Sequence, residues 1–448
     1  MRRRERFTRG LARLAMRVFF SEVEVIGAEN VPAQGPLIVV GNHQNSLIDP
    51  ALMTGFLPRH PRLLAKSTLW EVPFTRWLVR FAGAIPVYRR QDNVDVSRNA
   101  EMFARTHEEM FAGGAIALFP EGISHDEPAL QTLKTGAARI VLESQAKRPD
   151  LKVRVVPVGL IFDGRSRFRS RALLQIGPPL EVTEEPSTYA GDPRGAVREL
   201  TARIEAALEE VTLNYKSWEQ ERLIRRVAEL TAHEARGDGR PVTLSDRARQ
   251  QQAFVDGYRR ILGLAPERVD ALAARVRRYD RLLGICGLAD HQVTAQERRG
   301  RALWFLARFA AFALLGSVAI TAGVLLNYLP YRVCGWAGGR ARNRDMIATV
   351  KVVTGLFLFP AVWIAEAAAA AWWGGWPYAL GMLALAPATG LVALEGHDRR
   401  QRFFAEARAW LFLRTQSRLA ADLRLQRRAI LAEVRRLAGL LRAERAER

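Results

Sequence analysis

A histidine and a carboxylate lie close together near the start of the chain, in the stretch LIVVGNHQNSLIDP at residues 37–50. His43 directly follows an apolar run of β type, and Asp49 follows after five intervening residues. A histidine beside a carboxylate can act as a general base, because the carboxylate fixes the tautomer and orientation of the imidazole. On a continuous helix, residues six apart lie about 240° apart around the axis. We therefore expect residues 44–48 to form a turn that brings the two side chains together.

Two alternatives apply to this stretch. Asp49 precedes Pro50, and Asp-Pro is also a helix start, with Asp as the N-cap and Pro at the first helical position. Asp49 could therefore serve only as a cap. Ser46 lies between the two residues and could be proposed as a nucleophile, but it is not part of a GxSxG elbow, which argues against that role.

Three further blocks follow along the chain: FAGAIPVYRR (81–90), IALFPEGISHDEPALQTLKTG (116–136) and VRVVPVGLIF (153–162). They supply fixed cations, a glutamate and glycine turns. These are groups that can hold a phosphate.

Short β-branched runs alternate with helical stretches from Val23 to about Gly177, and this alternation predicts an α/β domain with a largely buried sheet. The expected strands are Leu37 to Val40, Ala84 to Tyr88, Ile116 to Phe119, Val153 to Leu160 and Leu173 to Ile176. Expected helices include Asp95 to Gly113 and Ala137 to Gln145.

The charge balance is strongly basic, with a formal net charge of +21 over 448 residues. Nucleic acid and anionic membrane lipid are both possible partners. Long apolar segments toward the C-terminus favour the lipid, so we expect an anionic membrane and no nucleic acid. Cys286 and Cys334 form no CxxC pair, which indicates a reduced, cytoplasm-facing protein with neither a disulfide framework nor a metal site.

Three apolar segments occur within residues 301–397, at about 309–329, 352–373 and 378–394. The first two are long enough to cross a bilayer, and the third is marginal against the roughly 20 residues that a crossing needs. Because arginines flank the segments, three full crossings would violate the positive-inside rule. We expect the first segment to dip in and return, broken near Gly316 or at residues 327–330, and the others to form a hairpin at Gly374 and Gly375. Buried core helices are the alternative.

The remaining parts are charged and helical in pattern. Residues 1–22 are basic and amphipathic, which predicts a helix either in the membrane plane or packed on the α/β domain at 23–185. Residues 186–300 form a charged helical region without a chemical motif. Residues 398–448 form an arginine-rich helical tail, which predicts a short coiled coil or a helix on anionic lipid.

In residues and order, the four blocks resemble those of the glycerolipid acyltransferases, which include glycerol-3-phosphate and lysophosphatidate acyltransferases. Their first motif has four residues between the His and the Asp, whereas this chain has five. That longer spacing, together with EGISHD (121–126), LKTG (133–136) and FRSRALLQIGPP (168–179), is similar to the fungal glycerol-3-phosphate and dihydroxyacetone-phosphate acyltransferases. The resemblance implies a mixed sheet flanked by helices, followed by a helical region and C-terminal membrane segments.

The resemblance also implies roles for single residues. His43 would be the general base and Asp49 its orienting carboxylate. Arg89 matches an arginine associated with the acceptor phosphate, and Glu121 and Gly122 match residues that arrange the acceptor site.

One departure concerns the third motif, which in the family continues with Thr and Arg. Here Ile123, Ser124 and His125 follow Gly122, so that arginine is missing. His125 or Lys134 could supply the charge, and Lys134 is the better candidate because it stays protonated at neutral pH. The candidate substrate-binding set is therefore Arg89, Glu121, Gly122, Ser124, His125 and Lys134. The alternative is a surface salt-bridge set of Arg90, Glu121 and Lys134.

The implied activity is O-acyl transfer from an acyl-CoA or acyl-carrier-protein thioester to glycerol 3-phosphate or 1-acylglycerol 3-phosphate, without a cofactor or metal. The implied location is the inner membrane, with the catalytic domain facing the cytoplasm. The alternative is a non-catalytic lipid-binding or membrane-organising protein. The motifs leave open the acceptor, the acyl chain, the thioester carrier and the oligomeric state.

Overall fold

The computed structural model describes residues 3–182, 189–236, 242–294 and 299–447. Their contacts divide the chain into two compact units, which we describe separately. The α/β unit consists of Met1–Asn214 together with Ala341–Thr349. The helical unit consists of Tyr215–Arg340 and Val350–Arg448.

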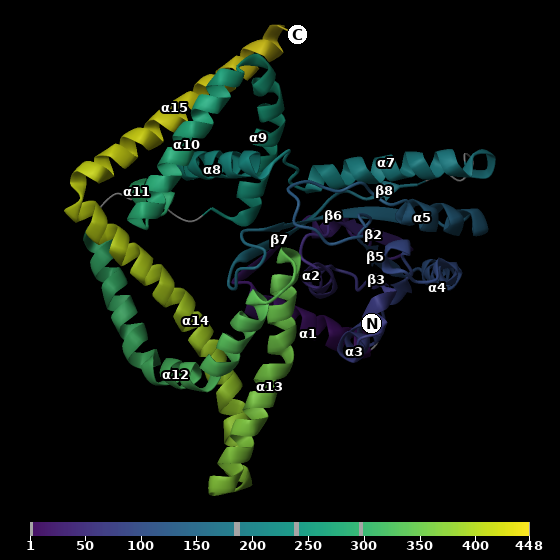
Figure 1. The fold of residues 1–448 in the computed structure, drawn as a ribbon, viewed down its shortest axis with the longest axis horizontal. Coiled ribbons are helices and arrows are strands. Elements are labelled where there is room, and N and C mark those ends of the chain that lie inside the picture. The colour runs from purple at the N-terminus through teal and green to yellow at the C-terminus, as the bar shows by residue number, and fades with distance from the viewer. Residues whose placement is uncertain (1–2, 183–188, 237–241, 295–298, 448) are drawn as a thin grey trace. The chain divides into compact units, whose positions relative to one another are not determined.

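The α/β unit is built on one eight-stranded sheet (Figure 1). Its strands are β1 (Glu22–Ile26), β2 (Leu37–Gly41), β3 (Arg62–Lys66), β4 (Ile85–Val87), β5 (Ala115–Leu118), β6 (Arg154–Phe162), β7 (Arg171–Ile176) and β8 (Leu180–Glu181). Their order is β1-β7-β6-β2-β5-β3-β4, and β8 pairs with β6. Strand β6 runs antiparallel to β7 and β8, while the other pairs are parallel. The predicted α/β class with a mixed sheet is confirmed.

Strands β1, β3 and the two-residue β8 were not expected from the sequence. Strand β1 reads EVEVI and β3 reads RLLAK, and neither contains a fully buried residue. The alternation of β1 is a strand signal that could have been used, whereas RLLAK of β3 has no clear period of two. The five expected strands correspond to β2, β4, β5, β6 and β7.

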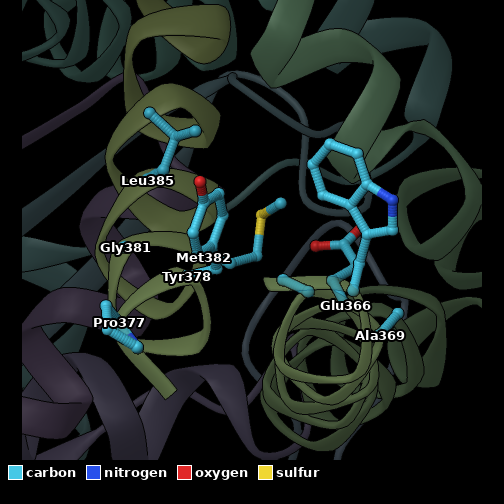
Figure 2. Close-up of a pocket in the computed structure, with 9 residues that line it drawn as sticks. Glu366, Ala369, Pro377, Tyr378, Gly381, Met382 and Leu385 are labelled. Carbon is cyan, nitrogen blue, oxygen red and sulfur yellow. The ribbon is translucent and has the colours of Figure 1, made fainter. Parts of the chain in front are cut away.

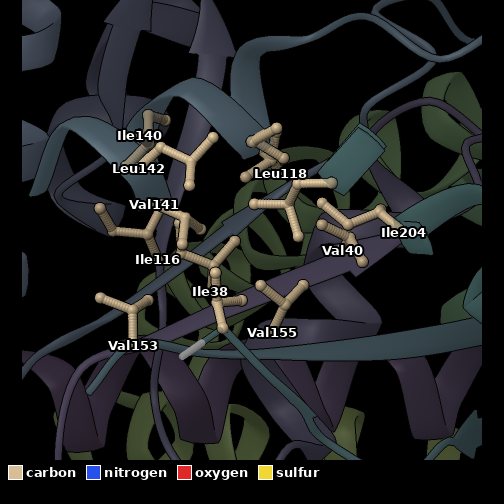
Figure 3. Close-up of a cluster of buried hydrophobic side chains, with 14 of the residues drawn as sticks. Ile38, Val40, Ile116, Leu118, Ile140, Val141, Leu142, Val153, Val155 and Ile204 are labelled. Carbon is tan, nitrogen blue, oxygen red and sulfur yellow. The ribbon is translucent and has the colours of Figure 1, made fainter. Parts of the chain in front are cut away.

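Both faces of the central strand β2 are covered. Ile38 and Val40 belong to a core cluster with side chains of α4 (Asn99–Phe111), α5 (Gly136–Lys147) and α7 (Pro193–Val211) (Figure 3). Leu37 and Val39 point to the opposite face and are equally buried. Burial on both faces is typical of parallel strands in α/β proteins.

Helix α7 places the boundary of the α/β unit later than the predicted end at residue 185. Its Leu200, Ile204 and Leu208 are fully buried in the core cluster of the sheet. The unit therefore extends to Asn214. The charged residues of α7 conceal this in the sequence, because only one stripe of an amphipathic helix is apolar.

The N-terminal helix α1 (Arg3–Phe19) packs on α2 (Ile48–Phe56). The guanidinium of Arg9 donates to the carbonyls of Leu57 and Pro58, and Arg13 donates to the carbonyl of Gly55. These carbonyls lie at the C-terminal end of α2, where the helix leaves acceptors without intrahelical donors. Of the two predicted alternatives for this helix, the structure thus shows packing on the α/β domain.

The helical unit has its own core. It is formed by α8 (Trp218–Arg236), α9 (Leu244–Leu264), α10 (Pro266–Cys286), α11 (Asp290–Thr294) and α15 (Ser417–Glu447). The apolar stripe of α15, including Leu423 and Ile430, is buried in this cluster. The basic tail was expected to form a coiled coil or to lie on a lipid surface. Its apolar stripe instead packs against other helices of the same chain.

The first predicted apolar segment lies in α12 (Arg299–Gly339), and its side chains up to residue 317 lie outside the described residues. The expected break near Gly316 or at residues 327–330 is wrong, because α12 is continuous and contains Pro330. Figure 1 shows that this helix bends along its length instead.

The predicted turn at Gly374 and Gly375 is confirmed. Helix α13 (Ile347–Gly374) ends next to Gly375, whose φ of 81° is left-handed, and α14 (Trp376–Thr415) follows at once. Within the described residues, Arg344–Gly374 and Trp376–Thr415 are long and apolar enough to cross a membrane, and their most apolar 18-residue windows have mean hydropathies of 1.9 and 1.6. Beside the turn, residues of α13 and α14 line an open groove of about 850 Å³, including Glu366, Trp373, Tyr378 and Met382 (Figure 2).

Candidate active site

The site lies where two neighbouring parallel strands end. Strand β2 ends at Gly41 and β5 at Leu118, so the loops that follow them meet at the carboxyl edge of the sheet. Asn42 fixes the first loop, since its amide donates to the Leu160 carbonyl at 3.1 Å and accepts from the Leu160 N–H at 2.7 Å. This arrangement holds His43 opposite the loop that carries Glu121.

His43 and Asp49 are in contact. The distance from Nδ1 of His43 to Oδ2 of Asp49 is 2.9 Å, and the side chains are 18% and 0% exposed. Residues 44–47 form bends and turns before α2 begins at Ile48, as the spacing requires. The backbone N–H groups of Gln44 and Asn45 donate to the same Oδ2 at 2.8 and 2.7 Å.

Asp49 is therefore more than a helix cap. It lies inside the first turn of α2, while Leu47 occupies the N-cap position. With Nδ1 of His43 donating to Asp49, Nε2 is the ring nitrogen left with a lone pair, as a general base requires. The imidazole stacks on the Phe119 ring, with centroids 4.2 Å apart and planes 14° apart.

Glu121 is buried in the second loop, and its carboxylate binds three protein groups. Its Oε1 accepts from the backbone N–H of His43 at 2.7 Å, and its Oε2 accepts from the backbone N–H of Gln131 at 2.7 Å and pairs with Nε2 of His125. Nδ1 of His125 accepts from the backbone N–H of Glu127 at 3.1 Å. Both ring nitrogens of His125 thus bond to protein groups, which leaves Lys134 as the more available of the two predicted cations.

Ser124 supports the turn between His43 and Asp49, because its Oγ accepts from the backbone N–H of Ser46 at 2.9 Å. The structure brings Glu121, Ser124 and His125 together around that turn, and each bonds to a protein group there.

Arg89 reaches the same loop but is already paired. Its guanidinium holds both carboxylate oxygens of Asp92, at 2.7 and 2.8 Å, and donates to the Gly122 carbonyl. Gly122 has a left-handed φ of 75°, and a Cβ there would lie 3.4 Å from Cγ of Lys134. The stem of the exposed Lys134 thus covers the glycine turn. The predicted salt-bridge set is not observed for Glu121, which pairs with His125, and the Arg90 side chain lies outside the described residues.

Several supporting residues were missed by sequence reasoning. Phe119 ends the predicted strand at 116–119, and an aromatic residue at a strand end is a weak signal that could have been used. Asn42 directly precedes His43 and could also have been found. Met346 and Thr349, which contact the turn from far along the chain, carry no local signal.

A histidine oriented by a buried carboxylate at the carboxyl edge of an α/β sheet defines a site suited to deprotonating a hydroxyl group. The loop after β5 carries Lys134 and the Gly122 turn, and Arg89, which follows β4, contacts that turn. Such a site is typical of an enzyme that transfers a group to an alcohol.

Comparison with known proteins relates this chain to acyltransferases, which transfer an acyl group. Residues 22–161 match the sequence model of the Acyltransferase family. Glycerol-3-phosphate O-acyltransferase 2 of Saccharomyces cerevisiae is 24% identical, over 78% of this chain and 62% of that protein. Glycerol-3-phosphate O-acyltransferase 1 of the same yeast is 25% identical, over 47% and 40%. The 1-acyl-sn-glycerol-3-phosphate acyltransferase alpha of Ovis aries is 32% identical, over 28% and 42%.

Residues 22–161 form an acyltransferase domain, and the similarity to the two yeast glycerol-3-phosphate O-acyltransferases confirms the resemblance seen in the motifs. The chain spans less than two thirds of the length of these three relatives.

Proposed function

We propose that this protein is a membrane-bound O-acyltransferase that moves a fatty acyl group from a thioester to glycerol 3-phosphate or 1-acylglycerol 3-phosphate. The observation that carries the proposal is the 2.9 Å contact between His43 and the fully buried Asp49. The alternative of a non-catalytic lipid-binding protein offers no reason to keep an oriented, partly exposed imidazole.

The chemistry needs only groups of this chain and its two substrates. Neutral His43 takes the proton of the acceptor hydroxyl at Nε2 while the oxygen attacks the thioester carbonyl. The tetrahedral oxyanion then collapses, so that the new C–O bond remains, the C–S bond breaks and the thiolate leaves. The proton held by His43 passes to the thiolate or to solvent. Asp49 keeps the imidazole in the required tautomer and stabilises its protonated form.

Glycerol 3-phosphate is the acceptor that we place first. The yeast relative with this substrate in its name aligns with 78% of the chain, whereas the sheep relative named for the 1-acylated substrate aligns with 28%. We assign Lys134 and Arg89 to the acceptor phosphate, because an ammonium and a guanidinium beside the glycine turn offer charge and directed donors to it. Acyl-CoA or acyl-carrier protein would supply the thioester as a co-substrate.

We further propose that the apolar helices anchor the enzyme in the inner membrane, with the α/β unit on the cytoplasmic side. The two long apolar helices and the net charge of +21 support association with an anionic bilayer.

The test is a release assay for free thiol on the purified full chain in detergent, with acyl-CoA or acyl-carrier-protein thioester and each acceptor in turn. We expect thiol release that depends on the acceptor, with one new acyl ester identified by mass. Failure of every donor and acceptor pair, in a preparation that still binds anionic vesicles, would support the non-catalytic alternative.

A further inference from the structure

A short segment between the two apolar helices α12 and α13 belongs to the α/β unit. Residues Ala341–Thr349 group with Met1–Asn214 in their contacts, although they lie near residue 345 of the chain. The segment comprises an exposed stretch, a 3₁₀ turn at Arg344–Met346 and the start of α13. Ala348 and Thr349 are 0% and 5% exposed, so this end of the segment is packed.

The segment contacts the turn that joins His43 to Asp49. Oγ1 of Thr349 accepts from the backbone N–H of Leu47 at 3.0 Å, across 302 positions of sequence. Oγ of Ser46 donates to Sδ of Met346 at 3.4 Å.

A further contact reaches the second loop of the site. The guanidinium of Arg344 lies 3.8 Å from the carboxylate of Asp126, which neighbours His125. Arg344 is mostly exposed, so this ion pair adds little energy.

This turn needs support from outside itself. Ser46 has a left-handed φ of 40°, a strained conformation for a non-glycine residue that persists only where the surroundings enforce it. Leu47 is the N-cap of α2, and its side chain makes no cap hydrogen bond. Amide groups at a helix start need acceptors. Ser124 provides one for Ser46, and Thr349 provides one for Leu47.

We propose that Ala341–Thr349 completes the active site and that Thr349 is a positioning residue for the His43 and Asp49 pair. The Thr349 hydroxyl accepts from the N–H of Leu47, the N-cap residue of α2, and α2 carries Asp49 in its first turn. The geometry of the base therefore depends on a residue at the start of an apolar helix. This inference rests on the proposed function, because the pair that Thr349 positions is the proposed general base.

The kinetic test replaces Thr349 by valine, which keeps the shape and removes the acceptor. We expect kcat to fall by roughly 10-fold to 100-fold, because small misplacements of a catalytic group are costly. The KM values of both substrates should change less than about twofold, because Thr349 is buried and its hydroxyl is bonded to the backbone of Leu47. Thr349→Ser keeps the hydroxyl and should retain most of the rate.

Thr415→Val is the matched control. Thr415 is an exposed threonine whose hydroxyl donates to the Leu411 carbonyl of its own helix at 2.8 Å, and we expect wild-type kinetics. Wild-type kcat in Thr349→Val, or equal losses in Thr349→Val and Thr349→Ser, would overturn the positioning role.

A cross-link tests the contact without turnover, and it decides the question if Thr349→Val fails to fold. Cysteines at Ser46 and Met346, in a chain without Cys286 and Cys334, should form a disulfide on mild oxidation, detected as a linked peptide by mass spectrometry. The control pair joins Met346 to Asp150, which precedes β6 at the edge of the sheet opposite His43.

The outcomes of this experiment separate the two proposals. A link in an inactive protein contradicts only the proposed function. No link at 46 and 346, or equal linking of the control pair, overturns the inference.

Discussion

The Asp49 carboxylate directs three donors to one oxygen, and this geometry explains why the turn after β2 is so constrained. Oδ2 binds the His43 ring and the N–H groups of Gln44 and Asn45 within 2.9 Å. Any loss of this oxygen changes the imidazole tautomer and the course of the turn together. In the proposed mechanism, the residues that orient His43 should therefore affect the rate as well as His43 itself.

We predict that His43→Ala lowers kcat by about 10² to 10⁴, because general-base catalysis accounts for a rate factor in that range. The variant should still fold and bind membranes. Asp49→Asn should also lower kcat, since an amide disturbs the tautomer of the ring without removing it. Thiol release and circular dichroism of the same preparations provide the check. Near-wild-type turnover in His43→Ala would show that another group is the base.

A second residue prediction concerns the acceptor phosphate. Lys134→Ala should raise the KM for glycerol 3-phosphate at least about tenfold and leave the KM for the thioester nearly unchanged, since only the acceptor loses a charge contact. Lys134→Arg, which keeps the charge, should show a smaller change. Equal effects of Lys134→Ala on both KM values would indicate a structural role at the Gly122 turn.

Helices α12 and α14 of the helical unit approach each other closely at Gly323. A Cβ at Gly323 of α12 would lie 2.1 Å from the Thr389 carbonyl of α14. Next to it the buried Asn327 amide donates to the Ala386 carbonyl of α14 at 3.2 Å and accepts from Trp363 of α13 at 2.9 Å. Small residues that allow close approach, with a polar side chain bonded between helices, are typical of membrane helix packing.

We therefore predict that Gly323→Ala lowers the melting temperature of the detergent-solubilised protein. The free energy of unfolding should fall by about 1–3 kcal/mol, the cost of an overpacked contact. Gly335 of the same helix is the matched control, because a Cβ there meets nothing within 4 Å. Gly335→Ala should be neutral or slightly stabilising, since alanine favours helices over glycine. Equal melting temperatures for the two variants would contradict close packing at Gly323.

Considering the whole molecule, the helical unit contains a buried ionic cluster that should make its stability sensitive to acid. Asp290 accepts from Tyr279 at 2.7 Å, pairs with His233 at 3.0 Å and with Arg427 at 3.1 Å. Burial alone would raise the pKa of the Asp290 carboxyl, but the hydrogen bond from His233, the charge of Arg427 and the hydrogen bond from Tyr279 hold this pKa below its ordinary value. Burial, with the charge of His233, also lowers the pKa of His291.

A carboxyl with a lower pKa in the folded state stabilises the fold above its unfolded pKa, and this stabilisation is lost as pH falls through the folded pKa. The lowered pKa of His291 also makes the folded state less stable in acid. Below about pH 6.5 the unfolded chain binds a proton at this histidine more readily, and protonation therefore favours unfolding. We predict that the melting temperature falls from pH 7 to below pH 4. Asp290→Asn should be less stable at pH 7 and less sensitive to acid, whereas the exposed Asp256→Asn should behave like the wild type. If the melting temperatures of the wild type and Asp290→Asn fall in parallel with pH, Asp290 is not the source of the acid sensitivity.

Connectivity also restricts how the chain can meet a bilayer. One buried cluster contains Val293, which precedes α12, and Leu423, which follows α14, so in the membrane arrangement that we propose both flanks would lie on the same side. A hairpin of α13 and α14 returns the chain to the side of Ala341–Thr349. Helix α12 must then begin and end on one side, which agrees with its bend in Figure 1.

We predict that residue 342 shares the side of the α/β unit and that only the turn at residues 374–376 reaches the other side. Single cysteines at Arg342 and at the exposed Trp376, in a chain without Cys286 and Cys334, would be treated with an impermeant thiol reagent from outside sealed cells. Labelling at 376 alone is expected, because the arginine-rich flanks then face the cytoplasm. Labelling at 342 would require three full crossings.

The sequence alone determined those features that depend on local order. Apolar β-branched runs identified five strands of the sheet, the distance between His43 and Asp49 required a turn, and paired glycines marked the hairpin at Gly375. These signals are readable because backbone geometry and periodicity act over a few residues.

Only the tertiary structure decided which distant groups meet. Helix α7 packs on the sheet and α15 packs in the helical core. Arg89 pairs with Asp92, and His125 pairs with Glu121. Thr349 contacts the turn that follows His43. An amphipathic stripe shows that a helix is buried but does not identify its partner, and a polar side chain does not reveal which of several partners it will bond. Those choices depend on packing the whole chain, and no local pattern in the sequence records them.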